Sequence, residues 1–140
     1  EIYREIYKKS VVEEIAGLLQ LLNLLKDKNI PTAIATTSQK KNREFVLEEL
    51  GIAKSDFSVI VGDEDVKKGK PDPEIYLKAA EKMQVDPSKC LVFEDSLVGI
   101  ESAKRAGMKV VALTTSHSKK ELSNADLITD NFTQLTNQQN

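Results

Sequence analysis

Short apolar segments alternate with amphipathic ones along this chain, and that alternation restricts its fold more than any other feature of the sequence. Segments that are apolar throughout are typical of parallel strands buried on both faces. The amphipathic stretches between them supply the crossover helices that parallel strands require. The pattern therefore predicts an α/β fold built on a doubly wound parallel sheet. Its predicted strands are residues 32–36, 57–61, 90–93 and 110–113, with a weaker candidate at 126–128.

Helix signals mark the stretches between these strands. Ser10 and Glu13 have the spacing of a capping box, which predicts a helix that begins there and runs to about Lys28. Gly51 and Gly107 stand where a left-handed residue commonly ends a helix. Further helices are predicted over residues 39–50, from 72 onward, and over 96–106.

Length and composition exclude several classes of protein. The 140 residues suffice for one sizeable core, and 20 basic against 22 acidic residues argue against a nucleic-acid or anionic-membrane partner. The single cysteine, Cys90, cannot form an intramolecular disulfide, and with the single histidine, His117, it cannot supply a four-ligand Cys/His zinc site. No apolar run reaches the roughly 18 to 20 residues that span a bilayer. We expect a reducing, cytoplasmic setting.

Polar side chains follow the predicted strands at the points where those strands end. The right-handed crossover rule brings the carboxyl ends of parallel strands to one edge of the sheet, and ligands bind at that edge in open α/β folds. The residues expected to gather there are Thr36, Thr37 and Ser38 after the first strand, Lys70 after the second strand and a loop, Glu94, Asp95 and Ser96 after the third, and Thr114, Thr115 and Ser116 after the fourth.

These residue types suit a phosphate and a divalent cation. Thr36, beside backbone N–H groups, can bind an anion, and Lys70 is a compact positive charge for a phosphate oxygen. Glu94 and Asp95 are oxygen donors of the kind that Mg²⁺ prefers. Each feature alone has an ordinary explanation as a helix cap, a surface lysine or a turn. Their grouping on one edge predicts a site for phosphate and Mg²⁺.

Other functional motifs do not match. Six residues separate Gly62 from Gly69, too many for a phosphate-binding loop, and no Gly-x-Gly-x-x-Gly appears. Cys90 is expected to be a small buried side chain within a strand, and His117 to be solvated in a polar loop. The acidic run 63–65 is expected to be an exposed loop.

Three motifs resemble those of the haloacid dehalogenase-like hydrolase superfamily, in the branch of β-phosphoglucomutase and phosphoglycolate phosphatase. They are residues 36–38, 69–73 and 93–100, which are similar to the family's second, third and fourth motifs. The resemblance implies that Thr36, through its hydroxyl, and Thr37, through its N–H, bind the transferring phosphoryl group. It implies that Lys70 neutralises that group. It also implies that Asp95 binds Mg²⁺, and that Glu94 either binds the ion directly or lies next to its direct ligands.

The family's first motif, Asp-x-Asp after a central strand, has no counterpart in this chain. The only Asp-x-Asp is residues 63–65, which follow the second predicted strand. We therefore expect a C-terminal portion of a longer enzyme, without the nucleophile strand and most of a helical cap. Its expected parts are residues 1–10 as the end of a cap helix or linker, 11–136 as the core domain and 137–140 as a polar tail. A missing segment or a second chain would complete the sheet between residues 32–36 and 90–94.

The activity that the resemblance implies is Mg²⁺-dependent hydrolysis of a small phosphate ester, such as a sugar phosphate or phosphoglycolate, through an aspartyl-phosphate. The expected partner is a small phosphorylated metabolite, with neither nucleic acid nor membrane. This chain without the nucleophile is expected to be inactive. Two alternatives remain open, a phosphosugar mutase like β-phosphoglucomutase and an inactive homologue that serves as a binding module.

Overall fold

The structure, a computed structural model, describes residues 17–38, 40–49 and 51–133. None of the helices in these ranges combines the length and the apolar composition that crossing a bilayer requires. In chain order, the main elements are α2 (Leu18–Asp27), β1 (Ala33–Ala35), α3 (Lys40–Glu49), β2 (Val59–Val61), α4 (Glu74–Met83), β3 (Leu91–Glu94), α5 (Leu97–Arg105), β4 (Lys109–Leu113) and β5 (Leu127–Thr129).

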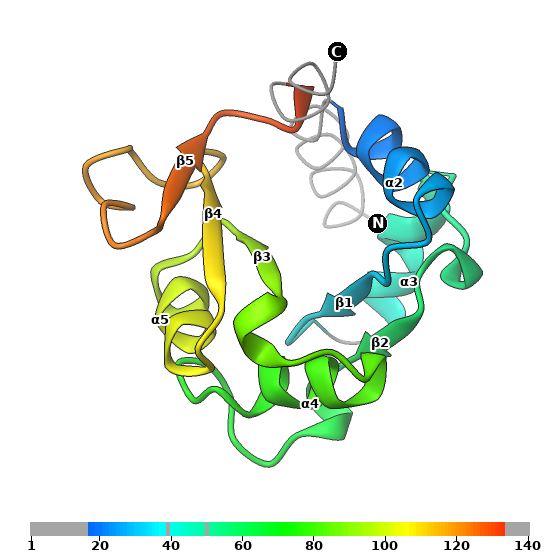
Figure 1. Cartoon of the computed structure of the whole chain (residues 1–140), viewed down its shortest axis with the longest axis horizontal. Coiled ribbons are helices and arrows are strands. Elements are labelled where there is room, and N and C mark those ends of the chain that lie inside the picture. The colour runs from blue at the N-terminus through cyan, green and yellow to red at the C-terminus, as the bar shows by residue number, and fades with distance from the viewer. Residues whose placement is uncertain (1–16, 39, 50, 134–140) are drawn as a thin grey trace.

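All five predicted strands form, and every pairing between them is parallel. β1 pairs with β2, with Ala33 opposite Val59. β4 pairs with β3 on one side, with Val110 opposite Val92, and with β5 on the other. The strands are thus divided between a sheet of two, β1-β2, and a sheet of three, β3-β4-β5 (Figure 1). The predicted doubly wound α/β architecture is confirmed, and within the described ranges no strand joins β1 to β3.

The core lies between the strands and the helices that connect them. Helix α4 packs against β1 and β2, whereas α5 packs against β3 and β4, and the two helices contact each other (Figure 1). Apolar side chains at helical spacing on both helices meet the apolar strands, as the sequence pattern requires. The side chains with no more than 2% exposure include Val61, Ile75, Ala80, Ile100, Ala103, Val110 and Ala112.

Polar side chains and glycines mark the ends of the helices. Ser96 precedes α5, and its Oγ accepts a hydrogen bond of 3.0 Å from the Gly99 N–H. Asp72 accepts one of 3.0 Å from the N–H of Glu74, the first residue of α4. Gly51 and Gly107 have φ values of 69° and 81°, which confirms their predicted left-handed conformation.

The first predicted helix is interrupted at Gly17, and its predicted start at Ser10 lies outside the described residues. Helix α2 starts at Leu18, because the residue before it, Gly17, has a φ of 88° and cannot continue a right-handed helix. A Cβ atom at Gly17 would lie 2.5 Å from the backbone nitrogen of Thr133, so the C-terminal part of the described chain packs directly on this glycine. Residues 1–16 and 134–140 lie outside the described ranges, and with them the predicted cap-helix end and polar tail.

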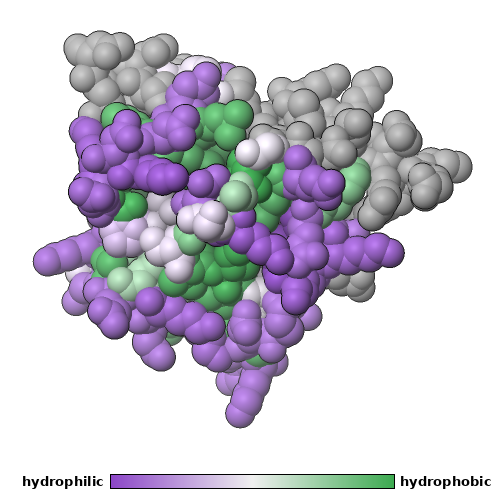
Figure 2. All heavy atoms as spheres, turned by 90° about the vertical axis from the view of Figure 1, so that its right-hand side faces the viewer, coloured by the Kyte–Doolittle hydropathy of each residue, from purple (hydrophilic) through white to green (hydrophobic). Residues whose placement is uncertain are grey.

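Large apolar side chains remain exposed on this fold. Leu91 on β3 is 55% exposed, and Leu19 and Ile30 on the α2 side are 48% and 46% exposed. Figure 2 shows apolar side chains between hydrophilic ones on one face of the molecule. Leu91 belongs to the edge of β3 that no described strand covers.

Candidate functional site

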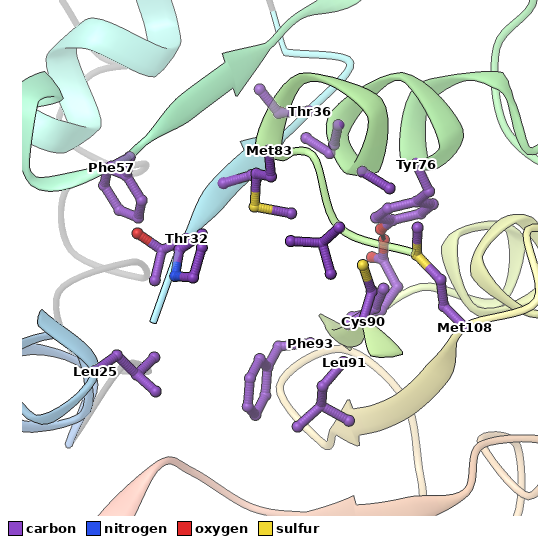
Figure 3. Close-up of a pocket in the computed structure, with 18 of the residues that line it drawn as sticks. Leu25, Thr32, Thr36, Phe57, Tyr76, Met83, Cys90, Leu91, Phe93 and Met108 are labelled. Atoms are coloured by element: carbon purple, nitrogen blue, oxygen red, sulfur yellow. Dashed lines mark hydrogen bonds between the residues drawn. The ribbon is translucent and has the colours of Figure 1, made fainter. Parts of the chain in front are cut away.

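A cavity of about 1030 Å³ separates the two sheets. Its walls come from β1, β3, α2 and α4, and most of its lining is apolar, with Leu25, Phe57 and Phe93 among the side chains seen in Figure 3. All five predicted site residues, Thr36, Thr37, Lys70, Glu94 and Asp95, line the same cavity. Ser38 and the three residues that follow β4, 114–116, were expected at this edge as well, but they are not among the lining residues.

Glu94, the last residue of β3, is the most densely bonded side chain of this group. It is 8% exposed, and its Oε2 accepts a hydrogen bond of 2.9 Å from Lys70 Nζ and a second one from the hydroxyl of Tyr76. Its Oε1 accepts hydrogen bonds of 3.2 Å from the Asp95 N–H and from Ser96 Oγ. Both oxygens of Glu94 therefore already have two donors each.

Lys70 and Tyr76 come from one stretch of chain, the loop before α4 and the first turns of that helix. The Lys70 ammonium lies 5.0 Å from the centre of the Tyr76 ring, in addition to its ion pair with Glu94. The side chain of Lys70 is only 12% exposed. Figure 3 shows Tyr76 projecting from α4 into the cavity. The lysine is thus held in place by a carboxylate and an aromatic ring, unlike a solvated surface lysine.

The charge state of this cluster follows from its surroundings. Burial opposes ionisation of Glu94, but the Lys70 ammonium and the hydrogen bonds from Tyr76, Lys70 and the Asp95 N–H outweigh it and hold the pKa of Glu94 below its usual value. Burial, with the charge of Glu94 beside it, raises the pKa of Tyr76. Glu94 is therefore an anion at neutral pH, and Tyr76 is a proton donor to it.

Gly99 permits the close approach of α5 to Glu94. A Cβ atom at Gly99 would lie 2.0 Å from the carboxyl carbon of Glu94. The contact in the structure is with the buried carboxylate at the end of the strand, so a larger residue would displace Glu94.

Asp95 follows β3 and meets a different set of donors. The hydroxyls of Thr115 and Ser116 each donate to Asp95 Oδ2 over 3.2 Å. The Nδ1 atom of His117 lies 3.0 Å from the backbone carbonyl oxygen of Asp95. His117 is half-buried, so its prediction as a solvated loop residue is wrong, because the loop after β4 folds back onto Asp95.

Thr36 and Thr37 follow β1 on the other side of the cavity. Thr36 Oγ1 accepts a hydrogen bond of 3.0 Å from the Ser38 N–H, and the Thr36 N–H donates to the Val61 carbonyl over 3.0 Å. Among the described residues, no acceptor takes the hydroxyl proton of Thr36, which can therefore be donated to a ligand oxygen. Within the described part of the chain, no acceptor takes the Thr37 N–H.

Of the two adjacent carboxylates, only Asp95 has an oxygen that is open to a magnesium ion among the described residues. Among the described residues, no three His, Cys, Asp or Glu side chains lie close enough together to form a metal cluster. Mg²⁺ is commonly bound through one or two carboxylates, with waters and substrate phosphates completing its coordination. Glu94 is occupied by four donors, whereas no described donor reaches Asp95 Oδ1. The donor set fits Mg²⁺ with Asp95 as a direct ligand.

Cys90 differs from its prediction as a buried residue within a strand. It stands immediately before β3 and is half-exposed, with its Sγ atom 3.5 Å from the Asp86 carbonyl oxygen. Burial, together with the charge of Asp86, raises the pKa of its thiol. It lines the cavity (Figure 3), because the edge of β3 beside it is unpaired.

The acidic run 63–65 is a short 3₁₀ turn whose first two residues are exposed, as expected.

Two contributors to the site are absent from the sequence-based prediction. Tyr76 has no place in that prediction, because an aromatic residue at helical spacing gives no sign of where its hydroxyl points. His117 is dismissed for its polar neighbours. A usable signal existed for its loop, since Thr114, Thr115 and Ser116 also end a strand at the ligand edge.

A family comparison covers most of the chain. The model of a protein family described as "Haloacid dehalogenase-like hydrolase" matches residues 1–113. The match includes the loop after β1, the loop that carries Lys70, and the end of β3.

Individual relatives agree with the family match. The chain is 37% identical over 121 residues, 86% of its length, to validoxylamine A 7'-phosphate phosphatase from Streptomyces hygroscopicus subsp. limoneus. It is 35% identical over 135 residues, 96% of its length, to beta-phosphoglucomutase from Bacillus subtilis. It spans 56% and 57% of these two proteins. The crystal structure of CbbY from Rhodobacter sphaeroides in complex with phosphate is 32% identical, with a TM-score of 0.79 over 86% of this chain and 55% of that one.

Proposed function

The chain belongs to the haloacid dehalogenase-like hydrolase family, and on that basis we propose that it carries the phosphate-binding and metal-binding residues of a Mg²⁺-dependent phosphohydrolase of small phosphate esters. The observation that carries this proposal is the convergence of Thr36, Lys70, Glu94 and Asp95 on one cavity at the carboxyl ends of the strands. The names of the relatives support the substrate class, since one is a phosphatase of a phosphorylated metabolite and another was solved with phosphate.

Each residue has a role in this proposal. The Thr36 hydroxyl and the Thr37 N–H donate to oxygens of the phosphoryl group, and the Lys70 ammonium neutralises charge that develops on it. Glu94 holds Lys70 through the 2.9 Å ion pair, and Asp95 is the residue that would hold the metal, through Oδ1. When bound, Mg²⁺ supplies further stabilisation of negative charge on phosphoryl oxygens.

The nucleophile is proposed to be an aspartate on a strand that pairs between β1 and β3. The support for this is the cavity between the two sheets, whose bordering strand edges have no described partner and would otherwise leave backbone groups unpaired. Such a strand would run parallel to both neighbours and end beside Lys70 and Asp95. We call the chain with this strand in place the assembled enzyme.

The same cavity predicts that the 140-residue chain by itself is poorly stable or self-associates. Its free energy of unfolding should fall below the roughly 5–15 kcal/mol of ordinary domains, as measured by urea unfolding together with light scattering. Leu91→Ser removes a large apolar side chain that lines the cavity and should reduce association. Leu77→Ser is the matched control, since Leu77 is 41% exposed on α4 and does not line the cavity. Cooperative unfolding of a monomer with an empty cavity would contradict the prediction.

A phosphosugar mutase is the second candidate, favoured by the 35% identity to beta-phosphoglucomutase over nearly the whole chain. The two reactions share the steps at Thr36, Lys70 and Asp95 and differ in which hydroxyl finally accepts the phosphoryl group. An inactive homologue that only binds phosphorylated ligands is the third possibility.

Hydrolysis of p-nitrophenyl phosphate by the assembled enzyme tests the proposed function. A phosphatase should release phosphate with Mg²⁺ and stop when the metal is chelated, and the chain without the nucleophile strand should release none. A mutase should instead interconvert sugar 1- and 6-phosphates with little release of phosphate. Absence of both reactions in the assembled enzyme would leave the binding module as the function.

A further inference from the structure

The loop after β4 contacts Asp95 at three points. Thr115 and Ser116 donate to Oδ2, and the His117 ring meets the backbone carbonyl. The register of the sheet explains this placement, because β3 and β4 are adjacent and parallel, with Glu94 opposite Ala112. The residues that follow Leu113, the end of β4, therefore stand beside the residue that follows Glu94.

The two hydroxyls engage the same oxygen of Asp95. Both donate to Oδ2, whereas no donor in the described part of the chain reaches Oδ1. A carboxylate fixed from one side presents its other oxygen in a defined direction. The neighbouring Glu94 has no such free oxygen, since Lys70, Tyr76, Ser96 and the Asp95 N–H occupy it.

We propose that Thr115 and Ser116 are positioning residues, which hold Asp95 through Oδ2 so that Oδ1 faces a divalent cation, and that His117 fixes the backbone of Asp95 by donating from Nδ1 to its carbonyl oxygen. The inference deepens the proposed function and rests on its metal site. It adds residues that neither touch the phosphate nor bind the metal, and that act through the orientation of the ligand. Partners of this kind commonly change metal affinity by about 10- to 100-fold when removed.

The loop offers its own matched control. Thr114 precedes Thr115, but its hydroxyl donates to Asp130 over 2.7 Å and not to Asp95. Thr114→Val therefore removes one hydroxyl from the same loop without touching the metal ligand. Thr115→Ser keeps the hydroxyl that Thr115→Val removes. His117→Asn keeps a donor nitrogen near the position of Nδ1, which His117→Leu does not.

The test is a titration of the assembled enzyme with Mn²⁺, followed by the electron paramagnetic resonance signal of the free ion. Mn²⁺ stands in for Mg²⁺ because both prefer oxygen ligands. The double variant Thr115→Val/Ser116→Ala should raise the Mn²⁺ dissociation constant about 10-fold. The Mn²⁺ dissociation constants of three single variants, Thr115→Ser, His117→Asn and Thr114→Val, should each stay within about twofold of that of the parent protein. His117→Leu should weaken Mn²⁺ binding.

The outcomes separate this inference from the proposed function. An unchanged dissociation constant in the double variant, or an equal loss in Thr114→Val, would overturn the positioning role while leaving the metal site intact. Weak binding in Thr115→Ser would do the same, because the hydroxyl is still present. The proposed metal site fails, and the inference with it, if the parent protein binds no Mn²⁺ or if Asp95→Asn leaves its Mn²⁺ binding intact.

Discussion

Lys70→Ala is expected to lower the turnover of the assembled enzyme by about 10²-fold or more, the loss typical of a single electrostatic donor to a transition state. The structure supports this expectation because the Lys70 ammonium is held at the cavity by Glu94 and stacked against Tyr76. A charge fixed in place before the reaction stabilises the transition state without first having to be oriented. Steady-state kinetics with an aryl phosphate would measure the effect.

The control must separate lost charge from lost structure. Lys70→Ala leaves the Glu94 carboxylate buried without its counter-ion, which is destabilising in itself. The pair Lys70→Met/Glu94→Gln removes both charges and should recover much of the stability, as measured by thermal unfolding, but not the turnover. Lys68→Ala, at an exposed lysine in the same loop, should leave turnover unchanged. Recovery of turnover in the neutral pair would remove Lys70 from the proposed mechanism.

Asp95→Asn is expected to abolish both activity and its dependence on Mg²⁺. The substitution keeps the size of the side chain and leaves a carbonyl oxygen that can still accept from Thr115 and Ser116, so the surrounding loop should remain in place. It removes the negative charge that attracts the cation and places an amide NH₂ group, which cannot act as an oxygen ligand, where Oδ1 stands. Phosphate release measured across a range of Mg²⁺ concentrations would test this.

Asp130→Asn provides the comparison for that variant. Asp130 also accepts a hydrogen bond from a threonine of the β4 loop, but it bonds to Thr114 and is not among the cavity residues. Its neutralisation should leave the Mg²⁺ dependence as in the parent protein. Normal activity of Asp95→Asn at low Mg²⁺ would count against Asp95 as the metal ligand.

Local patterns in the sequence were sufficient for the order of the elements and for bringing the candidate site residues to one cavity. Apolar strands separated by amphipathic helices have one common solution, parallel pairing with right-handed crossovers. That solution carries Thr36, Lys70, Glu94 and Asp95 to one cavity although they are far apart along the chain. The glycine signals at 51 and 107 also succeeded, because a left-handed helix end depends on the residue itself.

The failures concern contacts between distant segments. The predicted first helix does not continue through Gly17, whose φ is 88°, and Thr133, more than a hundred residues later, packs against that glycine. His117 was assigned to solvent, because its neighbours in sequence are polar, yet it lies against Asp95. Local propensity contains no information on either contact.

The sequence by itself determined the parallel α/β architecture, the order of its elements and the polar candidates at the ends of strands and in the loop before α4, since these depend on periodicity and on the chirality of the chain. Only the tertiary structure decided which of these polar groups are hydrogen-bonded to one another and which can bind a ligand. It gave both oxygens of Glu94 to Lys70, Tyr76, Ser96 and a backbone amide, and left one oxygen of Asp95 free. The physical reason is that a hydrogen bond depends on the position and direction of single atoms, and packing sets these only when the strands and loops come together.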